Sequence, residues 1–67
     1  MIQITVNDKA ETTTATHLYD LLKIKGLTDE KAIAVALNQD VISKEEWATT
    51  PLAESDQVLI IKPTQGG

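Results

Sequence analysis

The chain has 67 residues, with ten Asp and Glu against six Lys, no Arg, no Cys and a formal net charge of −4. The absence of cysteine excludes a disulfide framework, a thiolate nucleophile and a Cys-type zinc site, and the absence of a basic footprint disfavours nucleic-acid binding. Because no stretch approaches the roughly 20 apolar residues of a membrane helix, and residues 1–6 lack the basic start and apolar core of a signal peptide, we expect one small cytoplasmic domain with an aliphatic core and no membrane partner.

The beginning of the chain has the pattern of a β-hairpin. Ile2, Ile4 and Val6 alternate with polar residues, and this period of two indicates a half-buried strand. Residues 7–9 are Asn-Asp-Lys, which is turn chemistry because short Asn and Asp side chains bond their own backbone and tolerate tight bends. Residues 10–15 are rich in Thr, a β-branched strand former. The sequence therefore predicts two strands joined by a tight turn.

A short amphipathic helix is predicted next. Thr16 offers a hydroxyl as an N-cap, and Asp20 places negative charge near the positive end of the helix dipole. One helical face carries Leu18, Leu21 and Leu22, at the spacing i, i+3 and i+4. Gly26 is placed to end the helix in a left-handed conformation. For the polar residues 28–31 that follow, a loop and an extra helical turn both remain open.

A second pair of strands is predicted from residue 32 to residue 42. Small and large apolar residues alternate over 32–38, which indicates a strand with Ile33, Val35 and Leu37 on the core side. Asn-Gln-Asp at 38–40 turns the chain, and residues 41–42 form a short strand.

A single helical turn follows this second hairpin. Ser43 and Glu46 have the S-x-x-E spacing of a capping box, in which each side chain satisfies the other residue's free backbone donor. The turn is expected to end near Trp47, and Pro51 blocks further helix.

The last predicted strand, residues 57–62, contains the run Val58-Leu59-Ile60-Ile61, which is typical of a strand covered on both faces. Only one helix is available as cover, however. If Val58 and Ile60 face that helix, Leu59 and Ile61 lie on a face with no obvious cover, and an exposed apolar patch commonly marks a partner surface. A covering loop and self-association are the alternatives. We predict that Leu59 and Ile61 belong to a partner-binding surface.

The predicted order is strand, strand, helix, strand, short strand, helical turn, strand. Strands at both ends of the chain with one crossover helix suit an α+β domain over residues 1–62, in which a mixed sheet wraps on the helix. Residues 63–67 have no apolar anchor and are predicted to be a flexible tail.

The tail ends in Gly66-Gly67, which is the motif with chemical content. It can be a frayed terminus without function. The functional alternative is that the terminal carboxylate reacts. A carboxylate is a poor electrophile, so an enzyme must activate it, normally as an acyl-adenylate. The chain must then enter a narrow active site as extended backbone, and glycine permits that close approach because it has no Cβ.

Besides the terminal glycines, two segments carry a resemblance to a known family. They are Ala-Val-Ala-Leu-Asn-Gln-Asp-Val-Ile-Ser-Lys-Glu-Glu-Trp at 34–47 and Leu-Ala-Glu-Ser-Asp-Gln-Val at 52–58. With Gly66-Gly67 they resemble the ThiS family, the sulfur-carrier proteins of thiamine biosynthesis. The resemblance covers essentially the whole chain, is strongest after residue 34, and implies a ubiquitin-like β-grasp fold. Ser55 departs from it, because relatives often have Gly there, and a positive φ at this turn would make Ser costly. Relatives also often place a basic residue before the acid of the Trp-ended turn; this chain has no arginine, and Lys44 keeps the charge there.

The resemblance implies a mechanism in which the carrier is a co-substrate, not an enzyme. A ubiquitin-activating-type adenylyltransferase would adenylate the Gly67 carboxylate with ATP and magnesium. A cysteine desulfurase or other sulfur donor would convert it to a thiocarboxylate, and a thiazole synthase would take the sulfur. Gly66 and Gly67 would enter the partners' active sites, and the carrier would bind no cofactor itself. The alternatives are a small subunit of molybdopterin synthase and a ubiquitin-like protein modifier or interaction module.

The remaining polar and aromatic residues have ordinary structural interpretations. His17 lacks a nucleophile and an orienting acid, so we expect a surface or boundary residue. Trp47 is interpreted as core or boundary and not as a partner anchor. The acidic pairs at 29–30 and 45–46 are interpreted as solvated charges and not as metal ligands.

Overall fold

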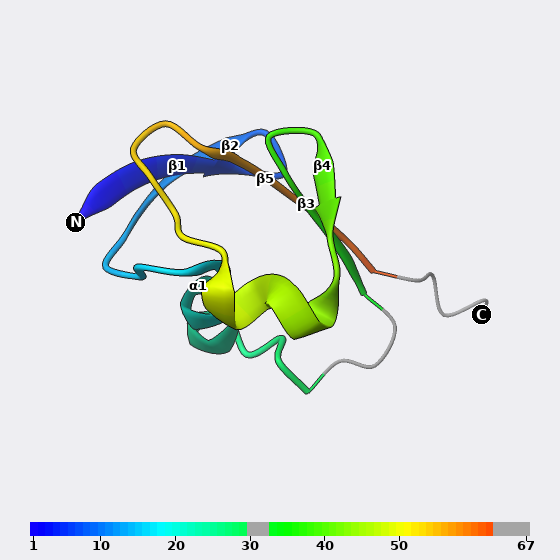
Figure 1. The fold of residues 1–67 in the computed structure, drawn as a ribbon. Helices are drawn as coiled ribbons and strands as arrows, with labels where there is room; N and C mark the ends of the chain where they lie inside the picture. Colours follow the sequence, from blue (N-terminus) through cyan, green and yellow to red (C-terminus); the bar gives the residue numbers. More distant parts are fainter. Residues whose placement is uncertain (30–32, 63–67) are drawn as a thin grey trace.

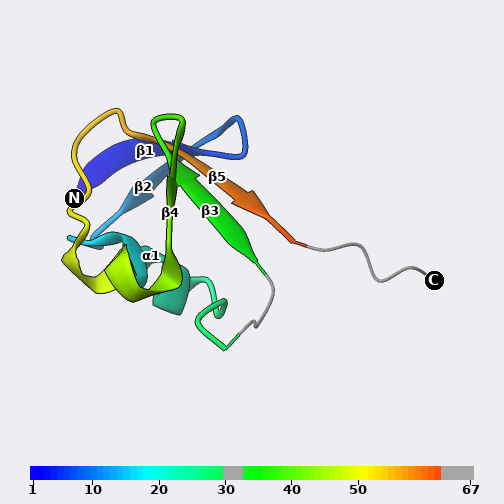
Figure 2. The same cartoon turned by 45° about the vertical axis from the view of Figure 1, so that its right-hand side comes forward.

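The computed structural model describes residues 1–29 and 33–62, and within them five strands form one mixed sheet (Figure 1). In chain order the elements are β1 (Ile2–Val6), β2 (Lys9–Thr13), α1 (Leu18–Ile24), β3 (Ala34–Leu37), β4 (Asp40–Ile42), the 3₁₀ helix η1 (Lys44–Thr49) and β5 (Gln57–Ile61). The strand order is β2-β1-β5-β3-β4, with β1 and β5 parallel and the other neighbours antiparallel. Both α1 and η1 lie on one side of the sheet (Figures 1 and 2). The predicted α+β architecture is confirmed, while the predictions for 63–67 and for the end of 28–31 fall outside the described residues.

Both hairpins turn through two residues with a left-handed backbone. Val6 pairs with Lys9 across Asn7 (φ 51°) and Asp8 (φ 69°). Leu37 pairs with Asp40 across residues 38 and 39, where φ is 51° and 76°. Positive φ at both central positions is the requirement of a type I′ turn, whose twist matches that of the flanking strands. Both predicted hairpins are confirmed, although Lys9 already belongs to β2 and β2 ends at Thr13.

Helix α1 is held by its leucine face and ended by Gly26. Leu18, Leu21 and Leu22 are fully buried, as the helical spacing predicted. Gly26 has φ +73°, and its Cβ position is open, so glycine is required here for its backbone conformation and not for space. The Gly26 N–H donates to Lys23 (3.0 Å) and the Leu27 N–H to Leu22 (2.8 Å), the bond pair of a Schellman motif.

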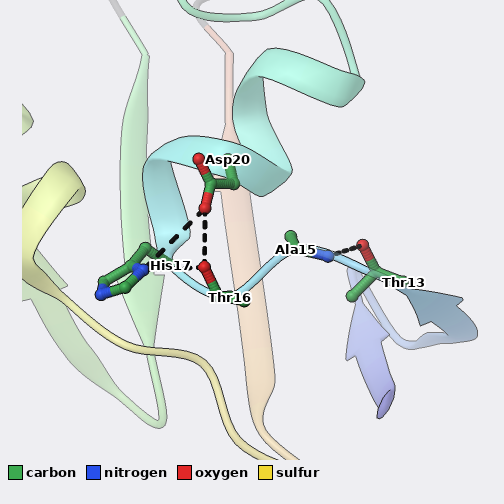
Figure 3. Close-up of polar contacts among 5 residues, drawn as sticks. All are labelled: Thr13, Ala15, Thr16, His17 and Asp20. Atoms are coloured by element: carbon green, nitrogen blue, oxygen red, sulfur yellow. Dashed lines mark hydrogen bonds and ion pairs between the residues drawn. The ribbon is translucent and has the colours of Figure 1, made fainter. Parts of the chain in front are cut away.

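The start of α1 differs from the prediction, because His17 and not Thr16 occupies the N-cap position, and no side chain caps the helix. The first helical N–H, that of Leu18, donates to the backbone oxygen of Thr50 at 2.8 Å. The Thr16 hydroxyl instead donates to Asp20 Oδ2 at 3.0 Å and lies 2.9 Å from His17 Nδ1 (Figure 3). The backbone oxygen of Thr50, which is distant in the sequence, thus accepts the hydrogen bond that the Thr16 hydroxyl was expected to accept.

The predicted capping box of η1 is also absent. Ser43 is at the N-cap position, but its hydroxyl makes no cap bond, because the Glu46 N–H donates to the Ser43 backbone oxygen at 2.9 Å. The 3₁₀ turn therefore uses the donor that a capping box needs. Trp47 is 1% exposed, confirming its assignment to the core, and its indole Nε1–H donates to the Ile42 oxygen at 3.2 Å. The prediction of a single turn ending near Trp47 is too short, because the 3₁₀ helix continues to Thr49; it ends before Pro51, as predicted.

The core lies between the sheet and the two helices. Its cluster of buried residues is Ile4, Val6, Ala15, Leu18, Leu21, Leu22, Leu27, Val35, Trp47, Val58 and Ile60. Ile33 and Leu37 are partly buried against this cluster, so the predicted core side of β3 is confirmed. Thr13 is a buried polar residue, and its hydroxyl accepts the Ala15 N–H at 3.1 Å (Figure 3).

Candidate functional site

The last strand, β5, separates its apolar side chains strictly between two faces. Val58 and Ile60 are buried against the helices, at 3% and 8% exposure. Leu59 and Ile61 are 47% and 54% exposed. The predicted strand register is therefore correct. The apolar run alone is typical of a strand covered on both faces, but the prediction that Leu59 and Ile61 lie on an uncovered face agrees with their exposure. In the described residues both helices lie on the side of Val58 and Ile60 (Figures 1 and 2).

The neighbouring strands extend this exposed surface. In the sheet register Leu59 lies opposite Ala36, Ile61 lies opposite Ala34, and Ala36 in turn lies opposite Val41. Residues that face each other across a sheet share a face, and Val41 is 78% exposed. We call this surface the apolar sheet face and define it by Ala34, Ala36, Val41, Leu59 and Ile61.

Three of these residues were missed in the sequence. The alternation in β3 that places Val35 on the core side also places Ala34 and Ala36 on the opposite face. A two-residue turn at 38–39 then fixes the pairing of Ala36 with Val41. The signal was present, but it required the turn length to be combined with the strand pattern.

A hollow of about 170 Å³ lies beside Leu59. Ala36 and Leu59 supply apolar lining, and the two hairpin turns border it; its other lining residues are Thr5, Asn7, Asp8, Gln39, Gln57 and Val58. An apolar centre with a polar rim is the usual anatomy of a protein–protein interface. The hollow thus has apolar residues, Ala36 and Leu59, surrounded by polar ones.

The loop before β5 is fixed by backbone and carboxylate bonds. The Ser55 N–H donates to the Gln3 oxygen at 2.7 Å, and Glu54 Oε1 accepts the Gln3 N–H at 3.1 Å. Within the loop, Asp56 Oδ2 accepts the Ala53 N–H at 2.8 Å. Ser55 has φ +70°, so this turn does need the left-handed conformation that favours glycine.

The other singled-out residues form no further centre in the described part of the chain. Across residues 1–29 and 33–62, no three His, Asp or Glu side chains lie close enough to hold a metal ion. His17 is partly exposed beside Asp20, 3.9 Å from Nδ1 to Oδ2, as expected of a boundary residue. Gly66 and Gly67 lie outside the described residues. In that same part of the chain no helix has the length and apolar character needed to cross a membrane.

Comparison with known proteins places these features in a family. No curated protein matches the chain. The crystal structure of a thiamine biosynthesis protein (ThiS) from Geobacter metallireducens is 25% identical, with a TM-score of 0.81 over 98% of this chain and 100% of that chain. An NMR structure of a thiamine biosynthesis protein from the same organism is also 25% identical, with a TM-score of 0.79 over 98% of this chain and 88% of that chain. The ThiS family model matches residues 3–67. The chain therefore belongs to the ThiS family.

Proposed function

We propose that the protein is a sulfur carrier that delivers sulfur for thiazole formation in thiamine biosynthesis. The observation that carries this proposal is the ThiS family match, which runs from residue 3 through the terminal Gly66-Gly67. The similarity to ThiS from Geobacter metallireducens, which spans the same length of chain, supports it. In this function the protein is a co-substrate, and the catalytic groups belong to its partners.

The reactive group in this proposal is the Gly67 carboxylate. An adenylyltransferase binds ATP and magnesium, and the carboxylate attacks the α-phosphorus of ATP to give an acyl-adenylate and pyrophosphate. A persulfide of a sulfur donor, such as a cysteine desulfurase, then attacks the acyl carbon and displaces AMP. A thiol reduces the resulting acyl disulfide, which leaves a thiocarboxylate on Gly67. A thiazole synthase consumes that sulfur, and the carboxylate is restored.

The apolar sheet face gives this chemistry a docking surface. It includes the last residues of β5, so it lies immediately before the segment that leads to Gly67. Binding of a partner there brings the terminus to the partner's active site, which converts a bimolecular reaction into an intramolecular one. Leu59 and Ile61 are the proposed central contacts.

Reconstitution with the partner adenylyltransferase tests the proposal. The full chain should support exchange of labelled pyrophosphate into ATP, because adenylate formation is reversible. A variant carrying one additional alanine after Gly67 is the matched control: its fold should be unchanged, but its terminal carboxylate belongs to alanine and not to glycine. Equal exchange by both proteins would refute Gly67 as the reacting group.

The acceptor separates this function from its alternatives. The thiocarboxylate form should transfer sulfur to a thiazole synthase and not to the large subunit of a molybdopterin synthase. Formation of isopeptide bonds to lysines of other proteins, without sulfur transfer, would instead indicate a protein modifier.

A further inference from the structure

The edge of β5 that faces β1 is held by a side chain where backbone pairing stops. The parallel pairing of β1 with β5 covers Thr5 with Gln57 and Val6 with Val58. The chain then turns away at Asn7. Beyond that point the Ile60 N–H donates to Asn7 Oδ1 at 2.8 Å, and Asn7 Nδ2 donates to the Ile60 oxygen at 3.2 Å. The planar amide of Asn7 thus replaces the next backbone unit of β1.

Asparagine suits position 7 in two respects, the conformation of the turn and the hydrogen bonds to Ile60. Asn tolerates the left-handed backbone of the turn, where φ is 51°. Its amide also offers one donor and one acceptor, and both are used on a single residue, Ile60. Asp would keep an acceptor for the Ile60 N–H but would face the Ile60 oxygen with a second oxygen.

Asn38 makes a closely similar arrangement at the other end of β5. It occupies the same position of the second hairpin turn, with the same φ of 51°. The Gln57 N–H donates to Asn38 Oδ1 at 2.9 Å, and Asn38 Nδ2 donates to Asp56 Oδ1 at 3.0 Å. Each asparagine thus uses both polar atoms of its amide at one end of β5. Asn7 bonds only backbone atoms, whereas Asn38 bonds one backbone N–H and the Asp56 carboxylate. Of the two, Asn7 lies at the end of β5 from which the chain continues to the terminus.

We propose that Asn7 is a positioning residue for the terminal glycine chemistry. Its side chain fixes Ile60 on the β1 side, while β3 holds the other side through the pairing of Ala34 with Ile61. The strand end from which the chain continues to Gly67 is thereby held on both edges. This inference rests on the proposed function, because a fixed strand end matters when a terminus must reach a partner's active site in one orientation.

Substitutions of the two asparagines by glycine test this inference with a built-in control. Asn7→Gly and Asn38→Gly both keep the left-handed turn, because glycine adopts positive φ freely, and each removes two side-chain bonds. The full chains are compared by the melting temperature, by NMR order parameters at residues 60–62, and by kcat and KM in reactions with the adenylyltransferase. Asn7→Asp, which keeps the bond from the Ile60 N–H, is expected to lie between Asn7→Gly and the unmodified chain.

Asn7→Gly should lower the order parameters at 60–62 and lower kcat roughly tenfold, because small displacements of a reacting group are costly. KM should stay within about twofold, because the residues proposed to dock remain in place. Asn38→Gly should change the melting temperature to a similar extent but leave kcat unchanged.

Three results would overturn the inference: unchanged order at 60–62 in Asn7→Gly, equal loss of kcat in both variants, or a rise in KM alone. The last would mean that Asn7 acts by direct contact, since it also lines the hollow beside Leu59. If the unmodified chain is not adenylated at all, the proposed function fails. The NMR comparison then still decides whether Asn7 holds the strand end.

Discussion

Residues with a left-handed backbone form the turns of both hairpins and the turn in the loop before β5. The Asn residues at positions 7 and 38 could be predicted as turn residues, because Asn tolerates this conformation. Gln39 and Ser55 adopt it as well, with φ of 76° and 70°, although neither residue type favours it. The resemblance to ThiS proteins pointed to Ser55 only because relatives often have Gly there. Strand register imposes the conformation of Gln39, so its own residue type could not predict it.

Ser55→Gly should stabilise the protein. Relief of the left-handed strain, which costs about 1–2 kcal/mol, is partly offset by the greater freedom of glycine in the unfolded chain, so the net gain is about 0.5–1 kcal/mol. Urea unfolding measures the change, and Ser55→Ala is the control, because it removes the hydroxyl but keeps the Cβ. A gain of equal size in Ser55→Ala would show that the Ser55 hydroxyl, and not its backbone, causes the cost.

Two hydroxyl caps were predicted and neither forms. In both cases a backbone oxygen takes the place expected for the side chain: Thr50 receives the Leu18 N–H, and Ser43 receives the Glu46 N–H through its carbonyl. The first of these acceptors is far away in the sequence, and the second depends on 3₁₀ geometry. The spacing of residues near each helix start therefore could not predict either acceptor.

At the scale of elements, the apolar pattern of β5 predicts which of its residues face the helix but not the extent of the apolar sheet face. The run from Val58 to Ile61 and the single predicted helix were enough to predict which residues face that helix. They were not enough to predict the width of the apolar sheet face, because its other members lie on β3 and β4. Those residues join Leu59 only through the register of the second hairpin.

Charges placed at adjacent positions of β5 should have opposite consequences. Ile60→Asp buries a charge without a partner, which costs several kcal/mol and should unfold a domain whose total stability is about 5 kcal/mol. Leu59→Asp should leave a folded protein and weaken binding to the adenylyltransferase by about 2 kcal/mol, as at an interface hot spot. Circular dichroism and a binding titration measure the two effects. Normal folding and binding by both variants would exclude the proposed docking surface.

Val41 and Ile24 offer a second comparison, between two exposed aliphatic residues on opposite sides of the molecule. They are 78% and 63% exposed, on β4 and α1. Val41→Ser should weaken binding to the adenylyltransferase by about 1 kcal/mol through loss of apolar burial. Ile24→Ser should bind as the unmodified chain does. A larger loss for Ile24→Ser would place the docking surface on the helical side.

At the scale of the whole molecule, the order of element types was predictable but the strand order β2-β1-β5-β3-β4 was not. Each element has its own local period, and strands at both ends of the chain suggested a mixed sheet. Which strand lies beside which depends on pairings over long sequence distances, such as that of Thr5 with Gln57. The sequence contains no local signal for these pairings.

Removal of Gly67 should separate stability from function. All members of the buried core cluster in the described part of the chain lie between Ile4 and Ile60. Deletion of Gly67 should therefore leave the melting temperature unchanged while abolishing adenylation. Thermal unfolding followed by circular dichroism measures the melting temperature, and the pyrophosphate exchange assay measures adenylation. A marked fall in melting temperature would show that the terminus contributes to packing.

The most direct test of the sulfur-carrier function is the intact mass of the protein isolated from its native host. We expect a fraction of the protein to have gained the mass that replacement of one oxygen by sulfur adds, and fragmentation should place this change at Gly67. Chemical alkylation should label that fraction, because a thiocarboxylate is nucleophilic and the chain contains no cysteine. An unmodified terminus in cells that are actively making thiamine, or a sulfur adduct on an internal residue, would contradict the proposed function.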